Sequence, residues 1–176
     1  MIRSLPCAAA ALLLLALTAC AHPEAKGCDV SVERDIVFST ETDQLRARAL
    51  GEACDKAVAL YVVSSPEGHP LWAWTAPMGH AFGAQFDMAD EEAIAGFLAD
   101  WAHPALASTA AAPDWSDALP THFDRQTYED VRARDLPMLC HLSGVARETC
   151  IYWEPAAAGA TALYERAAAP AENLQE

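Results

Sequence analysis

Histidines, carboxylates and cysteines are the residues of this chain that could do chemistry. Consecutive histidines are 11 to 47 positions apart, so none has the spacing of a local metal site (His22, His69, His80, His103, His122 and His141). The chain contains neither G-x-S-x-G nor H-E-x-x-H, two hydrolase motifs. We therefore expect unrelated surface or loop histidines, no metal and no cofactor. A hydrolase whose His, Asp and Glu residues meet only in the folded chain is the alternative.

The first twenty residues have the organisation of an export signal. Arg3 is the only charged residue before position 24, and the apolar run 5–17 follows it. This run is too short for a bilayer core, which needs about 20 residues. A charged start and a short apolar run are typical of a secretory signal. We therefore expect a signal at 1–19. Because no later apolar run reaches 18 residues, we also expect the rest of the chain to form a domain outside the bilayer.

The signal ends in Leu17-Thr18-Ala19-Cys20, an aliphatic residue, two small residues and a cysteine. This tetrapeptide resembles the lipobox of bacterial lipoproteins, and the resemblance covers residues 1–20. It implies lipidation of the Cys20 sulfur, cleavage before Cys20 and acylation of the new amino group, which together anchor a protein stably. The residue after the cysteine is Ala21. An aspartate at this position would suggest retention in the inner membrane, so Ala21 points to the periplasmic face of the outer membrane. Ordinary cleavage after Ala21, which would release the protein, is the alternative.

Four cysteines remain once Cys7 has left with the signal and Cys20 carries lipid. No C-x-x-C occurs among them, which argues against zinc binding and redox activity. In an oxidising compartment they should form two disulfides, and spacing favours Cys28–Cys54 and Cys140–Cys150 among three connectivities. A hairpin with a three-residue loop at 144–146 would place Cys140 directly opposite Cys150, within disulfide reach.

The acidic composition narrows the choice of partners. The chain has 11 basic and 25 acidic residues, a net charge of −14, which becomes −15 when Arg3 is removed. A protein that binds nucleic acids or anionic membrane surfaces by charge needs a basic face. We therefore expect this acidic domain to bind neither of them in that way. Electrostatic steering favours cationic partners instead. The linker 20–27 spans at most about 25 Å, so the domain should stay close to the membrane.

Apolar patterns predict a mostly antiparallel β-sheet. We expect strands at 30–38, 45–49, 57–63, 71–76, 136–142, 148–153 and 161–165, with the third covered on both faces. A helix should begin after the N-cap Asp90 and bury a stripe that ends at Trp101. A short second helix is expected at 126–133. Residues 28–166 should form one domain, and 167–176 a disordered tail.

These elements predict an α+β fold with one main helix packed on a face of the sheet and a disulfide-stapled C-terminal hairpin. A β-sandwich with a helical insertion is the alternative, because the two β regions could form separate sheets. Trp72 and Trp74 share a strand face and should pack beneath the helix, although they could also form a platform for sugars. Trp115 lies in the polar-flanked loop 113–117, where it could fill the domain edge or contact a partner.

The function expected from these features is that of a non-catalytic, lipid-anchored envelope protein. Its partner would be a cationic envelope protein or a cell-wall component. A hydrolase with a site assembled from scattered residues is one alternative. A structural or assembly accessory without a discrete ligand is the other.

Overall fold

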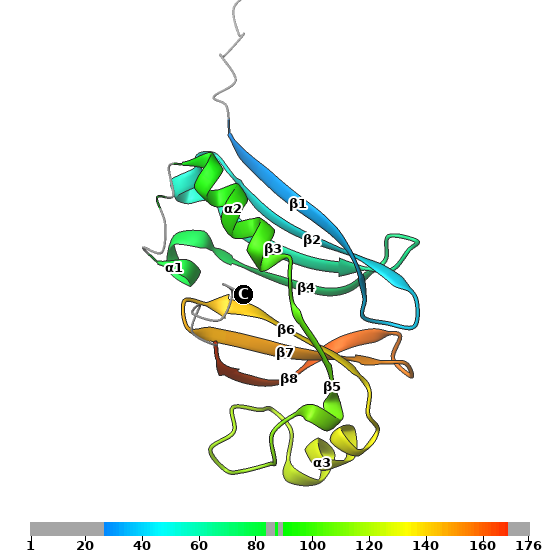
Figure 1. Ribbon diagram of the computed structural model, residues 1–176. Helices are drawn as coiled ribbons and strands as arrows, with labels where there is room; N and C mark the ends of the chain where they lie inside the picture. Colours follow the sequence, from blue (N-terminus) through cyan, green and yellow to red (C-terminus); the bar gives the residue numbers. More distant parts are fainter. Residues whose placement is uncertain (1–26, 84–86, 88–89, 169–176) are drawn as a thin grey trace, which may run out of the picture.

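Two four-stranded antiparallel sheets make up most of the computed structural model, which describes residues 27–83, 87 and 90–168 (Figure 1). In each sheet the strands follow one another in chain order. The first sheet contains β1 (Cys28–Val37), β2 (Thr42–Gly51), β3 (Val58–Ser64) and β4 (Pro70–Pro77). The second contains β5 (Ala105–Ser108), β6 (Pro137–Gly144), β7 (Arg147–Glu154) and β8 (Gly159–Ala167). Three helices accompany them: α1 (Met78–Phe82), α2 (Glu91–Trp101) and α3 (Arg125–Ala133).

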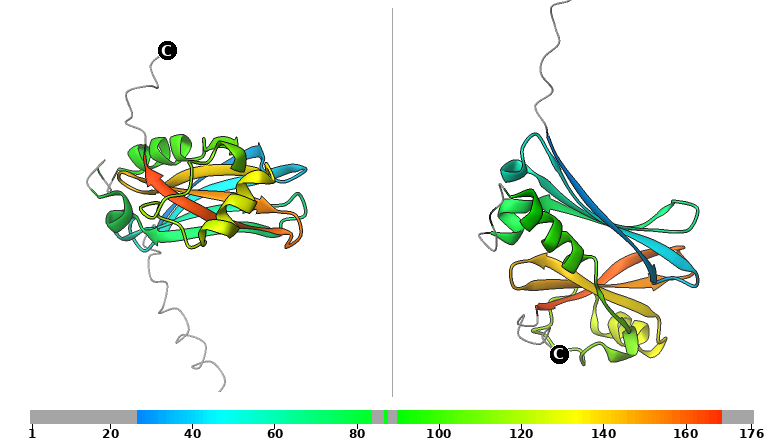
Figure 2. Two further views of the ribbon diagram at one scale, coloured as in Figure 1. Left: turned by 90° about the horizontal axis from the view of Figure 1, so that it is seen from below. Right: turned by 45° about the horizontal axis from the view of Figure 1, so that its top comes forward.

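The second sheet is the middle layer of the molecule. One of its faces packs against the first sheet, and α3 with the preceding loop covers the other (Figures 1 and 2). Side chains of both parities are therefore buried along β6 and β7. The first sheet is buried only on its inner face, and its outer residues such as Arg46 and Val58 are exposed. The expectation that residues 57–63 are covered on both faces is thus wrong.

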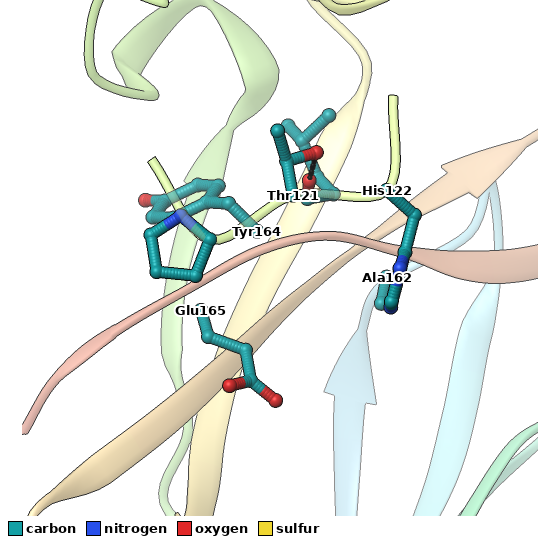
Figure 3. A pocket seen from close by; sticks show the side chains of 7 residues that line it. Thr121, His122, Ala162, Tyr164 and Glu165 are labelled. Carbon is teal, nitrogen blue, oxygen red and sulfur yellow. Dashed lines mark hydrogen bonds between the residues drawn. The ribbon is translucent and has the colours of Figure 1, made fainter. Parts of the chain in front are cut away.

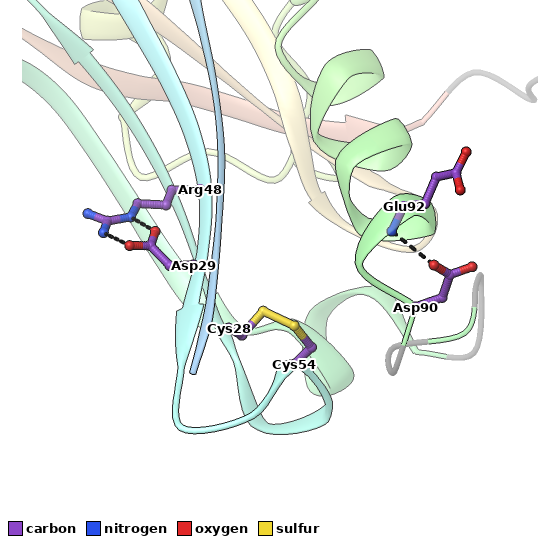
Figure 4. The surroundings of a disulfide bond; sticks show 6 residues. All are labelled: Cys28, Asp29, Arg48, Cys54, Asp90 and Glu92. Atoms are coloured by element: carbon purple, nitrogen blue, oxygen red, sulfur yellow. Dashed lines mark hydrogen bonds and ion pairs between the residues drawn. A yellow bond between two sulfur atoms is a disulfide. The ribbon is translucent and has the colours of Figure 1, made fainter. Parts of the chain in front are cut away.

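Helix α2 begins where the sequence predicts. The Asp90 carboxylate accepts a hydrogen bond of 2.9 Å from the Glu92 N–H, as an N-cap should (Figure 4). Its buried stripe of Ile94, Leu98 and Trp101 belongs to the core between the sheets. However, α2 is not the single main helix of one sheet, because α1 and α3 also form and the strands divide into two sheets. The molecule is sandwich-like, which agrees with the alternative expectation of two separate sheets.

The structure contains disulfides Cys28–Cys54 and Cys140–Cys150. Cys28 begins β1, and Cys54 lies in a 3-10 turn that follows β2 (Figure 4). Cys140 and Cys150 lie directly opposite each other in β6 and β7, with Cα atoms 4.0 Å apart. The loop between these strands is shorter than expected, since Gly144 rather than Ser143 faces Arg147. A register irregularity between Leu142 and Gly144 compensates, so the pairing of the cysteines is unchanged.

Several predictions concern residues outside the described part. The signal at 1–19, Cys20 and most of the linker 20–27 are among them, as are residues 169–176 of the tail. Ala167, the first residue of the predicted tail, is instead the last residue of β8. None of the helices in the described ranges has the length and apolar character needed to cross a bilayer.

Candidate functional site

A buried histidine lies between the two sheets. His141 is only 2% exposed, so the expectation of a surface or loop position is wrong for this residue. Side chains alternate between the two faces along β6. Cys140 points to the layer formed by α3, and His141 points to the first sheet. His141 lies among four aromatic side chains of the first sheet and α2, and we call this set the His141 cluster: Tyr61, Trp72, Trp74, Trp101 and His141.

Hydrogen bonds fix the tautomer of His141. The Trp72 indole Nε1 lies 3.1 Å from His141 Nε2, and the Leu142 carbonyl oxygen lies 2.9 Å from Nδ1. An indole N–H can only donate, so Nε2 accepts and the proton of the neutral ring is on Nδ1, which donates to Leu142. Both ring nitrogens are therefore occupied. The imidazole ring also stacks on Tyr61, with centroids 4.4 Å apart and planes inclined by 18°.

The surroundings of His141 keep it neutral. Burial lowers its pKa to about 4, although the hydrogen bond to the Leu142 carbonyl acts in the opposite direction. Burial also raises the pKa of the Tyr61 phenol. With its lone pair engaged by Trp72 and its ring enclosed, His141 is not placed to act on a substrate. Its arrangement suits the joining of the two sheets.

A surface pocket lies where the loop before α3 meets the edge of β8 (Figure 3). The Glu165 N–H donates to the Pro120 carbonyl at 2.9 Å, and the Thr121 hydroxyl donates to the Leu163 carbonyl at 2.6 Å. These bonds hold the loop against the open edge of the second sheet. The pocket has a volume of about 220 Å³, and His122 and Glu165 contribute to its lining.

The side chains of this pocket are suited to binding rather than to nucleophilic catalysis. The Thr121 hydroxyl is engaged by the backbone of β8, and Glu165 is 3.8 Å from Arg147. In Figure 3 neither His122 nor Glu165 is directed at the other. Burial raises the pKa of Tyr164, so its hydroxyl is a neutral hydrogen-bonding group at physiological pH. The pocket thus offers hydrogen bonds and an acidic rim.

The other histidines are distributed over the surface. His69, His80, His103 and His122 are exposed and belong to different segments, and His22 lies outside the described residues. Within residues 27–83, 87 and 90–168, no group of three or more His, Cys, Asp and Glu residues has the arrangement of a metal site.

Trp115 packs against the second sheet from the loop that leads to α3. It is partly buried and contacts the core formed by α3, β6, β7 and β8. The Arg125 guanidinium lies 5.9 Å from the centre of its ring, a cation–π distance. Its indole N–H is buried and has no hydrogen-bond partner in the described part of the chain. Trp115 thus fills the domain edge and leaves part of its ring at the surface.

Negative charge dominates because acidic residues outnumber basic ones, and most of the basic residues are in ion pairs. Residues 27–168 contain nine basic and 22 acidic residues, a net charge of −13. Seven of these basic residues form ion pairs with carboxylates: Arg46, Arg48, Arg125, Arg132, Arg134, Arg147 and Arg166. Near the first disulfide, for example, Arg48 makes two hydrogen bonds to Asp29 and lowers the pKa of that carboxyl (Figure 4).

Comparisons of the chain with protein-family models, with curated proteins and with solved structures find no match. Its function is therefore inferred from its own residues.

Proposed function

We propose that this protein is a lipid-anchored envelope lipoprotein that binds a cationic partner, either an envelope protein or a cell-wall component, without catalysing a reaction. The lipobox-like segment 17–20 supports the anchor on Cys20, and Ala21 after it supports a position on the periplasmic face of the outer membrane. The disulfides Cys28–Cys54 and Cys140–Cys150 support export, because such bonds persist in oxidising compartments.

The observation that carries the binding proposal is the pairing of seven basic residues out of nine. Paired arginines contribute little local positive potential, so the unpaired carboxylates determine the field around the domain. Such a field accelerates the approach of a cationic partner and weakens as salt is added. The short linker 20–27 keeps this acidic surface near the membrane, where a cationic envelope component is accessible.

We place the partner contact at Trp115 and the neighbouring pocket. Trp115 is partly exposed and is flanked in the chain by two exposed carboxylates, of which Asp114 pairs with Arg132 while Asp117 forms no ion pair within the described part of the chain. A lysine or arginine of the partner would share the Trp115 ring with Arg125, which lies 5.9 Å from its centre, and would pair with Asp117. The loop is held on β8 through Pro120 and Thr121, so the contact would be presented in a fixed position.

The binding proposal is tested by capture from envelope extract with the mature lipidated protein in detergent. We expect cationic proteins or cell-wall fragments to be retained at low salt and released at high salt. Trp115→Ala should reduce capture several-fold, while Trp115→Phe, which keeps an aromatic ring, serves as the matched control. A captured set that is insensitive to salt and to Trp115→Ala would refute the proposal.

The anchor is tested separately. Cys20→Ala should leave the protein unprocessed by the lipoprotein pathway and free of acyl chains, as intact mass spectrometry would show. If Cys20→Ala leaves processing and membrane attachment unchanged, the lipoprotein assignment is wrong, whatever the result of the capture experiment.

A further inference from the structure

We propose that the His141 cluster is an acid-sensitive connection between the two sheets. At neutral pH the hydrogen bond from Trp72 to His141 holds β4 against β6. Protonation of the His141 imidazole breaks this connection and opens the seam between β4 and β6 while the sheets themselves remain folded.

Three hydrogen bonds meet at one point of β6. The Trp72 indole of β4 donates to His141 Nε2 at 3.1 Å, and the Trp101 indole of α2 donates to the Leu142 carbonyl at 3.0 Å. The same carbonyl accepts the Nδ1–H of His141 at 2.9 Å. Among the strands of the described residues, Trp72 to His141 is the one side-chain hydrogen bond that joins the first sheet to the second. The bond from Trp72 therefore depends on the protonation state of one ring, whereas the two bonds to the Leu142 carbonyl keep their donors and their acceptor when that ring is protonated.

A proton on Nε2 is incompatible with the observed contact. The imidazolium carries N–H groups on both nitrogens and has no acceptor left. The Trp72 indole N–H would then face another N–H at 3.1 Å, and an indole cannot reverse its role. Trp72 must move away to let Nε2 reach water or another acceptor. Since Trp72 is only partly buried, it can do so without unfolding its strand.

The groups around His141 give an imidazolium no counter-charge. Tyr61 packs against it from β3, Trp74 from β4 and Trp101 from α2, while Thr149 lies opposite it in β7. Tyr61 is the one titratable side chain in this group, and burial raises its pKa, so it stays neutral in acid. No carboxylate of the described residues forms an ion pair with His141. The stacked Tyr61 ring attracts a cation, but it does not compensate for the loss of water.

The direction of the pH effect follows from the two states of the ring. In an open seam the imidazole is solvated and has an ordinary pKa near 6.5, whereas burial lowers the pKa to about 4 in the closed seam. The open state therefore binds the proton more tightly. The equilibrium favours the closed seam most strongly above about pH 6.5, and it shifts toward the open seam as the pH falls toward 4. The two pKa values differ by about 2.5, and each unit of difference corresponds to a factor of ten. Acid therefore shifts the equilibrium toward the open seam by at most about 300-fold.

The test uses the mature chain with both disulfides intact. Acrylamide quenching of tryptophan fluorescence and near-ultraviolet circular dichroism are followed from pH 7.5 to pH 4 and back, with far-ultraviolet circular dichroism as the measure of strand content. We expect a reversible rise in quenching in acid at constant strand content. His141→Gln, whose amide oxygen can accept from Trp72 but cannot be protonated, should abolish the rise. The exposed His69→Gln, in the turn between β3 and β4, is the matched control and should behave as the original protein.

Two results would overturn the proposal. One is an unchanged acid transition in His141→Gln, which would assign the transition to carboxylates. The other is a loss of strand content together with the rise in quenching, which would indicate global unfolding. If His141→Gln does not fold, NMR titration of the original protein decides the matter. The ring of His141 and the indole N–H of Trp72 should then shift together well below pH 6.5, and separate or ordinary titration would refute the connection.

Discussion

Tyr61 and Tyr128 allow a direct measurement of what a buried hydroxyl costs or contributes in this fold. Both side chains are 0% exposed. The Tyr61 hydroxyl has no hydrogen-bond partner in the described part of the chain, whereas the Tyr128 hydroxyl donates to the Pro113 carbonyl at 3.0 Å. The same substitution to phenylalanine should therefore have opposite effects on stability at the two positions.

The expected magnitudes follow from the partners. An unsatisfied buried polar group costs about 1–3 kcal/mol, and Tyr61→Phe removes this cost. The loss of the oxygen's packing contacts offsets part of the gain, so the free energy of unfolding should rise by about 1 kcal/mol. A typical hydrogen bond contributes about 1 kcal/mol net, so Tyr128→Phe should lower the free energy of unfolding by about 1 kcal/mol. The two variants should thus differ by about 2 kcal/mol in urea unfolding at pH 7. If Tyr61→Phe destabilises as much as Tyr128→Phe does, the Tyr61 hydroxyl is bonded in solution and the reasoning fails.

Other substitutions test the bonds that hold each layer. Replacing both cysteines of Cys28–Cys54, 26 positions apart, should cost about 3.5 kcal/mol, and the same change at Cys140–Cys150, 10 positions apart, about 3 kcal/mol. Urea unfolding of each pair variant measures this, and a negligible loss would contradict the loop-closure estimate. The buried Thr109 hydroxyl accepts from the Leu136 N–H and donates to the Val131 carbonyl, both at 2.9 Å. Thr109→Val should therefore cost about 2 kcal/mol, whereas exposed Thr161→Val should be nearly neutral; equal losses would show that these bonds are not responsible.

Local patterns were sufficient to predict much of the fold. The alternation of Leu45, Ala47 and Ala49 with polar residues predicts a strand with one buried face, and β2 has that face. Asp90 predicts the start of α2 because an N-cap acts within one turn. The predicted short helix at 126–133 also forms, as α3, and buries Tyr128 and Val131. These predictions succeed because each depends on neighbours in the chain.

The features that sequence patterns missed depend on contacts between distant segments. His141 is buried because aromatic side chains of β3, β4 and α2 pack around it, and Trp72 of β4 supplies the hydrogen-bond partner of its Nε2. No pattern within β6 indicates these distant neighbours. The one local signal of His141 is that it shares a strand face with Leu139, which belongs to the core between the sheets. Similarly, β5 has too few residues for a periodic pattern and forms because β6 offers an edge. Whether Trp115 meets a partner depends on a second molecule and stays a prediction.

The position of the first disulfide has a mechanical consequence. Cys28 is the first residue of β1, and its bond to Cys54 joins the start of the domain to the segment that leads into β3. Tension applied through the N-terminus passes across this bond directly toward β3, so β1 and β2 lie in a covalent loop that bears no load. An edge strand that would otherwise be peeled off first is thereby protected while the bond is intact. Reduction of Cys28–Cys54 would expose β1 to the applied tension, and the domain would then unfold from its N-terminal end.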